Sequence, residues 1–143
     1  AIVFFVECLA KLNRFKLTKL LYMADVRALE AFNVSITKAL YIRQVDGPWP
    51  PDINKVLRRL DRHDIALKYS KENQYIVKGP CPKLGLEFQE RELELLLDIV
   101  HKFGDFNNSQ LKIAAYKTRQ MQTILKDEKM GKNCLNKPVL GPF

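Results

Sequence analysis

Few residues of this chain have the types and spacing that proton transfer, metal binding or nucleophilic attack require. The two histidines, His63 and His101, lie in no HExxH or HxH motif and at no His/Cys spacing suited to zinc. The acidic cluster Glu90, Glu92 and Glu94 falls at a predicted helix start, where the helix dipole favours acids, and indicates a solvated face. No GxSxG, GxxxxGKS/T or GxGxxG sequence occurs. We therefore expect no metal, no cofactor and no enzyme activity.

The cysteines indicate a reducing compartment, and the apolar start of the chain indicates a buried helix instead of a signal peptide or membrane span. Cys8, Cys81 and Cys134 are an odd number without a CxxC pair, which predicts no disulfide framework. Residues 1–6 are strongly apolar, but they lack a preceding basic segment and fall far short of the roughly 20 residues that a membrane span needs. We expect a buried first helix, a cytoplasmic protein and no membrane contact.

The charged residues give stronger signals for binding than for catalysis. The net charge of +8 suits an acidic protein surface or nucleic acid phosphates as a partner, and it is also compatible with a role in solubility alone. In a predicted helix over residues 52–63, four cations at spacings of three, four and seven share the face opposite an apolar stripe. These cations are Lys55, Arg58, Arg59 and Arg62. We predict that this face contacts the partner, with a merely solvated face as the alternative.

A hairpin pattern follows this basic helix directly. Residues 65–69 and 74–78 are β-prone arms around a polar loop. A basic helix followed by a hairpin is the order of a winged helix-turn-helix, whose helix enters the major groove while the hairpin touches backbone phosphate. DNA binding, with autorepression, is therefore an alternative function. A Pro-rich stretch precedes the basic helix where such a fold has another helix, which weakens this interpretation.

The Pro-rich stretch, residues 46–51 (DGPWPP), places one aromatic side chain between prolines. Three prolines in four positions exclude a helix and predict a rigid turn. An exposed Trp49 held in this way would be a rigid aromatic of the type that anchors interfaces. Alternatively, Trp49 folds back as a lid on the core.

The remaining patterns predict a mainly α fold. The predicted helices span residues 2–12, 15–32, 52–63, 87–103 and 108–126. Asn13 is expected to end the first helix, and Asn33 is expected to end the second in a left-handed conformation. Residues 36–45 indicate an extended or weakly stranded connector, and residues 131–143 a loop-like tail. The tail is expected to pack through Leu135, Val139 and Leu140.

These elements describe a single domain over residues 1–143. We expect a compact helical domain with one short β-hairpin inserted between the third and fourth helices. A winged-helix-like segment is an alternative description of the basic helix and the hairpin. The oligomeric state is left open.

Several segments together resemble one known family. Residues 16–25 (KLTKLLYMAD) resemble the K-L-x-K-L-L-Y-x-A-D helix of the Panacea domain, the antitoxin SocA-like family of bacteria and their phages. Residues 35–37 are similar to its pre-strand turn, residues 56–60 to its next helix, and residues 111–125 to the closing helix of one subgroup. The family motif falls on Lys19, Leu20, Tyr22, Asp25, Tyr41, Gly47 and Pro48.

The resemblance implies a mostly helical domain that binds and neutralises a cognate toxin encoded nearby. Members of this family are paired with many unrelated toxins, so the toxin's chemistry is not inherited with the domain. Some relatives are known only as phage-associated proteins, which leaves a phage-associated interaction protein as a further alternative. Many members have a His where this chain has residues 116–118, so the partner surface is not transferred residue by residue.

Overall fold

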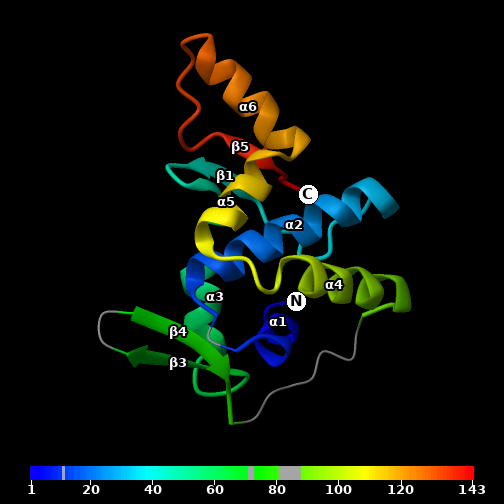
Figure 1. Ribbon diagram of the computed structural model, residues 1–143, viewed down its shortest axis with the longest axis vertical. Helices are drawn as coiled ribbons and strands as arrows, with labels where there is room; N and C mark the ends of the chain where they lie inside the picture. The colour runs from blue at the N-terminus through cyan, green and yellow to red at the C-terminus, as the bar shows by residue number, and fades with distance from the viewer. Residues whose placement is uncertain (11, 71–72, 81–87) are drawn as a thin grey trace.

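Helices account for most of the regular structure, which confirms a mainly helical fold, but two small antiparallel sheets occur among the described residues where one hairpin was predicted. The computed structural model describes residues 1–10, 12–70, 73–80 and 88–143. In this part of the chain the helices are α1 (Ile2–Cys8), α2 (Arg14–Phe32), α3 (Ile53–Leu60), α4 (Glu90–Phe103), α5 (Asn108–Tyr116) and α6 (Arg119–Lys129). The strands are β1 (Tyr41–Gln44), β2 (Gly47–Trp49), β3 (Ile65–Ser70), β4 (Asn73–Lys78) and β5 (Pro138–Leu140). Helix α2 runs through the middle of the molecule, with α6, β1 and β5 on one side and α1, α3, β3 and β4 on the other (Figure 1).

Helix α2 has a defined start and end. The side-chain oxygen of Asn13 accepts a hydrogen bond from the N–H of Lys16 at 2.7 Å, which satisfies a donor that the first turn leaves free. Asn33 ends the helix in the left-handed conformation with φ 59°, as predicted. The prediction that Asn13 ends a helix over residues 2–12 is wrong, because α1 already ends at Cys8 and Asn13 begins the next helix.

A three-stranded antiparallel sheet in the order β2-β1-β5 was not predicted as a unit. Tyr41 pairs with Leu140, so the connector predicted at residues 36–45 and the end of the chain form one sheet. Pro48 lies in the edge strand β2, where a missing N–H is tolerated. The rigid turn predicted for residues 46–51 is therefore in part a strand.

The tail packs differently from the prediction at one position. Leu140 is buried and Val139 is half-buried against the core, as expected. Leu135 lies in the turn before β5 and is 47% exposed, so the prediction that it packs inward is wrong.

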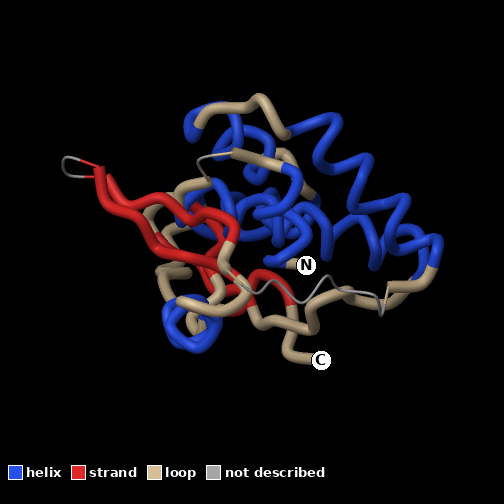
Figure 2. Tube along the Cα trace, turned by 90° about the horizontal axis from the view of Figure 1, so that it is seen from below, coloured by secondary structure: helices blue, strands red, loops and turns tan. Residues whose placement is uncertain are grey.

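Strands β3 and β4, which follow α3 and precede α4 along the chain, form a two-stranded antiparallel sheet. They pair over all six residues of each strand, and Figure 2 shows the pair projecting from the helical body. Ile65 and Ile76 are buried near its base. The N–H of Ile76 also donates to the carbonyl of Leu12 at 2.6 Å, which joins the sheet to the segment before α2.

The C-terminal helices differ from the prediction of one helix over residues 108–126. The backbone is extended at Thr118 (φ −67°, ψ 150°), so α5 ends at Tyr116 and α6 begins at Arg119. The Thr118 hydroxyl donates to the carbonyl of Ala115 at 2.7 Å, and such back-bonding competes with a continuous helix. Helix α4 begins at Glu90, and residue 87, the predicted start, lies outside the described residues.

The core forms where α2 packs against α1, α4 and α5, with the inward side chains of α3 and the two sheets completing it. The buried side chains of α4 and of the α5–α6 segment include Leu95, Leu96, Ile99, Leu111, Ala115 and Met121, as predicted. No helix in the part of the chain that the structure describes is long and apolar enough to cross a membrane.

Candidate functional site

The carboxylate of Asp25 is the centre of a buried hydrogen-bond network. It projects from the middle of α2 and is fully buried. Its Oδ1 accepts from the Ser35 hydroxyl and from the N–H groups of Ile36 and Thr37, each at 2.9 Å. Its Oδ2 accepts from the Tyr41 hydroxyl at 2.7 Å and from the Thr37 hydroxyl. Five donors thus satisfy one buried charge, which fixes residues 35–41 against α2.

Two buried tyrosines extend this network toward α5. The hydroxyls of Tyr22 and Thr118 lie 2.7 Å apart. The rings of Tyr22 and Tyr41 meet edge to face with centroids 5.3 Å apart. Burial raises the pKa of Tyr22 to about 12, and burial together with Asp25 raises the pKa of Tyr41 well above its ordinary value. Both tyrosines therefore stay neutral at ordinary pH and hold the network together through their hydroxyls and rings.

Lys19 joins α2 to strand β2. Its side chain is 1% exposed, and its Nζ donates to the carbonyl oxygen of Pro48 at 2.9 Å. The Nζ also lies 4.5 Å from the ring centroid of Phe15 and 5.8 Å from that of Trp49. Burial lowers the pKa of Lys19 to about 8, an effect that Asp46 partly opposes.

The glycine of β2 completes the contact between the sheet and the helices. Gly47 is buried and has φ +114°, which L side chains rarely adopt. A Cβ at Gly47 would lie 3.0 Å from a ring carbon of Tyr116 and 3.5 Å from the Cε of Lys19. Leu20, the remaining motif residue, is fully buried in the core.

All seven motif residues therefore lie inside the fold, where they hold α2, the 35–41 segment and β2 together. The model of the antitoxin SocA-like, Panacea domain family matches residues 17–120. The chain belongs to this family. No curated protein and no solved structure matches it. The seven predicted motif residues thus serve packing and internal hydrogen bonds in this fold, and a surface for the predicted partner has to be sought elsewhere.

The basic face of α3 is one such surface. Lys55, Arg58 and Arg59 are all exposed on α3, opposite the buried Ile53 and Leu57. Arg62 is also exposed, but α3 ends at Leu60 and Arg62 has a left-handed φ of 68°. The prediction that all four cations share one helical face is therefore wrong for Arg62, because the helix ends one turn too early.

Trp49, the two histidines and Cys8 are the remaining residues that the sequence analysis singled out. Trp49 is half-buried against the core and has Lys19 beneath its ring, so part of its surface faces outward. His63 and His101 are exposed. The exposed Cys8 has a pKa raised by desolvation and by Glu7, the opposite of an activated thiolate. Among the described residues, no group of three or more His, Cys, Asp or Glu side chains could hold a metal ion.

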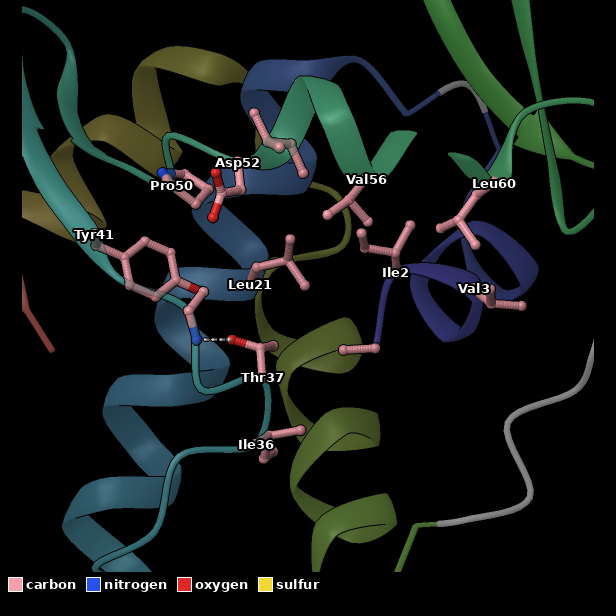
Figure 3. A pocket seen from close by; sticks show the side chains of 13 residues that line it. Ile2, Val3, Leu21, Ile36, Thr37, Tyr41, Pro50, Asp52, Val56 and Leu60 are labelled. Atoms are coloured by element: carbon pink, nitrogen blue, oxygen red, sulfur yellow. Dashed lines mark hydrogen bonds between the residues drawn. The ribbon is translucent and has the colours of Figure 1, made fainter. Parts of the chain in front are cut away.

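An apolar pocket lies between α1, α2, α3 and the 36–39 segment (Figure 3). Its volume is about 350 Å³. Ile2, Leu21, Val56 and Leu60 point toward it, so the apolar edge of α3 borders the pocket while the basic face points away. The hydroxyl of Thr37 at its rim accepts from the N–H of Ala39 at 3.0 Å and is not free for a ligand.

The lowered pKa of Lys19 predicts a rise in stability with pH. The folded chain loses this proton near pH 8, while the unfolded chain retains it up to about 10.5, so the unfolded state binds more protons in between. The free energy of unfolding should therefore rise, by roughly 1–2 kcal/mol between about pH 8 and 9.5. Urea unfolding of the wild type and of Lys19→Met across this range measures the effect.

The variant should lack this rise, and the difference between the two curves isolates Lys19 from other titrating groups. The pH range stops below the ordinary tyrosine pKa. Above that pH, Tyr22 and Tyr41 keep their protons in the folded state but lose them in the unfolded state, so the free energy of unfolding would fall with pH. Parallel curves for the two proteins would contradict the assignment.

Proposed function

We propose that this chain is an antitoxin-like protein that binds and neutralises a protein toxin encoded nearby, in the cytoplasm and by occlusion instead of catalysis. Membership of the antitoxin SocA-like, Panacea domain family is the observation that carries this proposal. The buried motif supports it, since it leaves the outer faces of the helices available for a partner.

Co-expression with the neighbouring reading frame tests the function directly. Growth of a host that carries the neighbour alone is compared with growth when this chain is also present. Arrest by the neighbour and recovery with this chain would support the proposal, and co-purification would establish direct binding. A harmless neighbour that does not co-purify would overturn it.

The basic face of α3, with Trp49, is the proposed contact for an acidic toxin surface. Reversing Arg58 and Arg59 to Glu is expected to weaken the complex at least about fivefold, because it replaces attraction by repulsion. Calorimetry with the purified toxin measures the affinity. The double variant Lys126→Glu/Lys129→Glu makes the same change in net charge on exposed residues of α6 and should bind nearly as well as the wild type. Equal loss in both variants would point to net charge alone and remove the α3 face from the proposal.

DNA binding is a second candidate function, favoured by the order of a basic helix followed by a β-hairpin. The exposed cations of α3 are followed by β3, where Lys68 is also exposed. The segment before α3 is strand β2 and two prolines, so the first helix of a helix-turn-helix is lacking there. Duplex binding should weaken steeply with salt if phosphates are contacted, and a dissociation constant above about 100 μM at low salt would exclude this candidate.

A further inference from the structure

A groove between α2, α4 and α5 shares no lining residue with the basic face of α3 and meets the motif network only at Thr118, whose hydroxyl contacts that of Tyr22. Its volume is about 500 Å³. Its apolar lining comes from Val26 of α2, Phe103 of α4 and Ala114 of α5, among others. Grooves with an apolar floor between helices are the usual receptors for an amphipathic segment of a partner.

The charged residues that line this groove are mainly cations. Arg27 lies in α2, Lys102 lies in α4 and Lys117 directly follows α5, whereas Glu30 is the one acid among the lining residues that the structure describes. The guanidinium carbon of Arg27 and the Nζ of Lys102 lie 5.4 and 5.5 Å from the ring centroid of Phe103. Within the described residues, none of the three cations forms a salt bridge. Their charges are therefore available to a carboxylate from outside.

Ile113 forms an exposed apolar edge of the groove. This side chain is 56% exposed although it lies in the middle of α5 and lines the groove. Covering an exposed β-branched side chain beside an apolar floor removes apolar surface from water, which favours binding of a partner. Apolar surface and cations thus occur together along the same groove, and both have to be complemented by the same occupant.

We propose that this α2–α4–α5 groove is the docking site for an acidic amphipathic helix of the protein partner. Aliphatic side chains of that helix cover Ile113 and the floor, and its flanking Asp or Glu side chains pair with Arg27, Lys102 and Lys117. The inference rests on the proposed function only in taking the partner to be a protein. It adds a contact surface and a chemical class of segment that the basic face of α3 does not supply.

A synthetic peptide tests the groove without knowledge of the toxin. The probe is a fluorescein-labelled helical peptide with leucines at i, i+3, i+4 and i+7 and glutamates on the flanks, and its binding is followed by anisotropy. Ile113→Glu is expected to weaken binding at least about fivefold, because it places an acid among the apolar contacts. Leu97→Glu is the matched control, since Leu97 is 49% exposed on α4 and does not line the groove. The control should bind within about twofold of the wild type.

Two further comparisons separate the electrostatic contribution to peptide binding from the apolar one. Lys117→Glu should weaken binding and flatten its salt dependence, and a peptide with lysines in place of the glutamates should bind far less well than the acidic one. Equal losses in Ile113→Glu and Leu97→Glu, equal binding of the two peptides, or no binding of the acidic peptide would each overturn the proposal.

The same variants distinguish failure of the groove from failure of the antitoxin function. If the neighbour is toxic and both Ile113→Glu and Leu97→Glu restore growth as the wild type does, the function stands and the groove is excluded as its contact. If no neighbour is neutralised but the acidic peptide binds in the groove-dependent manner described, the groove stands and the antitoxin proposal fails.

Discussion

Replacing Asp25 by Asn is expected to lower the free energy of unfolding by about 3–5 kcal/mol. The carboxylate accepts from five groups of the 35–41 segment, and an amide would turn its own N–H donors toward some of them. Several buried donors would then lose their acceptor inside the core. A fall in the thermal midpoint of roughly 10–17 °C follows for a chain of this size. Urea and thermal unfolding followed by circular dichroism measure both quantities.

The chain contains a matched control for this change. Asp98 is exposed on α4, so Asp98→Asn removes the same charge without disturbing a buried acceptor. The free energy of unfolding of this variant should stay within about 0.5 kcal/mol of the wild-type value. Similar midpoints for the two variants would contradict the view that Asp25 holds the 35–41 segment in place.

The elements that could be predicted from the sequence are those whose signal is local. Helix α2 shows a period of three to four over 19 residues and ends at Asn33, whose type favours the left-handed conformation. The apolar stripe of α3 is equally local. The three-stranded sheet has no such signal, because β1 and β5 each have one buried residue, Tyr41 and Leu140, and the two buried residues of β2 are adjacent. No strand of this sheet therefore shows alternation, and the pairing joins distant parts of the chain.

The candidate site could be predicted only in part for a related reason. A carboxylate on the apolar face of α2 needs hydrogen-bond donors when it is buried, so the position of Asp25 indicates a buried polar network. Its donors come from residues 35–41, and no local pattern identifies them. The α2–α4–α5 groove gave no signal at all, since its lining is drawn from three helices that are separate in the sequence. The break at Thr118 was likewise hidden, because its apolar neighbours continue the helical period.

The predicted motif residues lie away from the proposed contact on α3. These seven residues join α2 to the sheet and to the 35–41 segment. Substitutions of the exposed residues on α3 leave that network untouched, whereas the groove meets it at Thr118, whose hydroxyl lies 2.7 Å from that of Tyr22. Under the proposed function, a surface that can change without loss of the fold is the physical condition for a domain that meets unrelated toxins, as the resemblance implies.

Replacing Gly47 by Ala is expected to cost about 2–4 kcal/mol of unfolding free energy. Two effects add: the left-handed φ of +114°, and the approach of the new Cβ to within 3.0 Å of the Tyr116 ring. Trp49 lies in the same strand and is the only tryptophan of the chain, so its fluorescence reports whether β2 shifts. We expect a changed emission maximum together with the lower urea midpoint.

Gly131→Ala separates these two effects. Gly131 also has a left-handed φ, of +87°, but a Cβ there would meet no atom within 4 Å. This variant should therefore lose only the backbone contribution, about 1–2 kcal/mol, and leave Trp49 emission unchanged. The excess loss in Gly47→Ala then measures the contact with Tyr116 and Lys19. If both variants lose the same free energy, the tight packing of β2 against α5 contributes nothing, and the motif glycine acts through its backbone conformation alone.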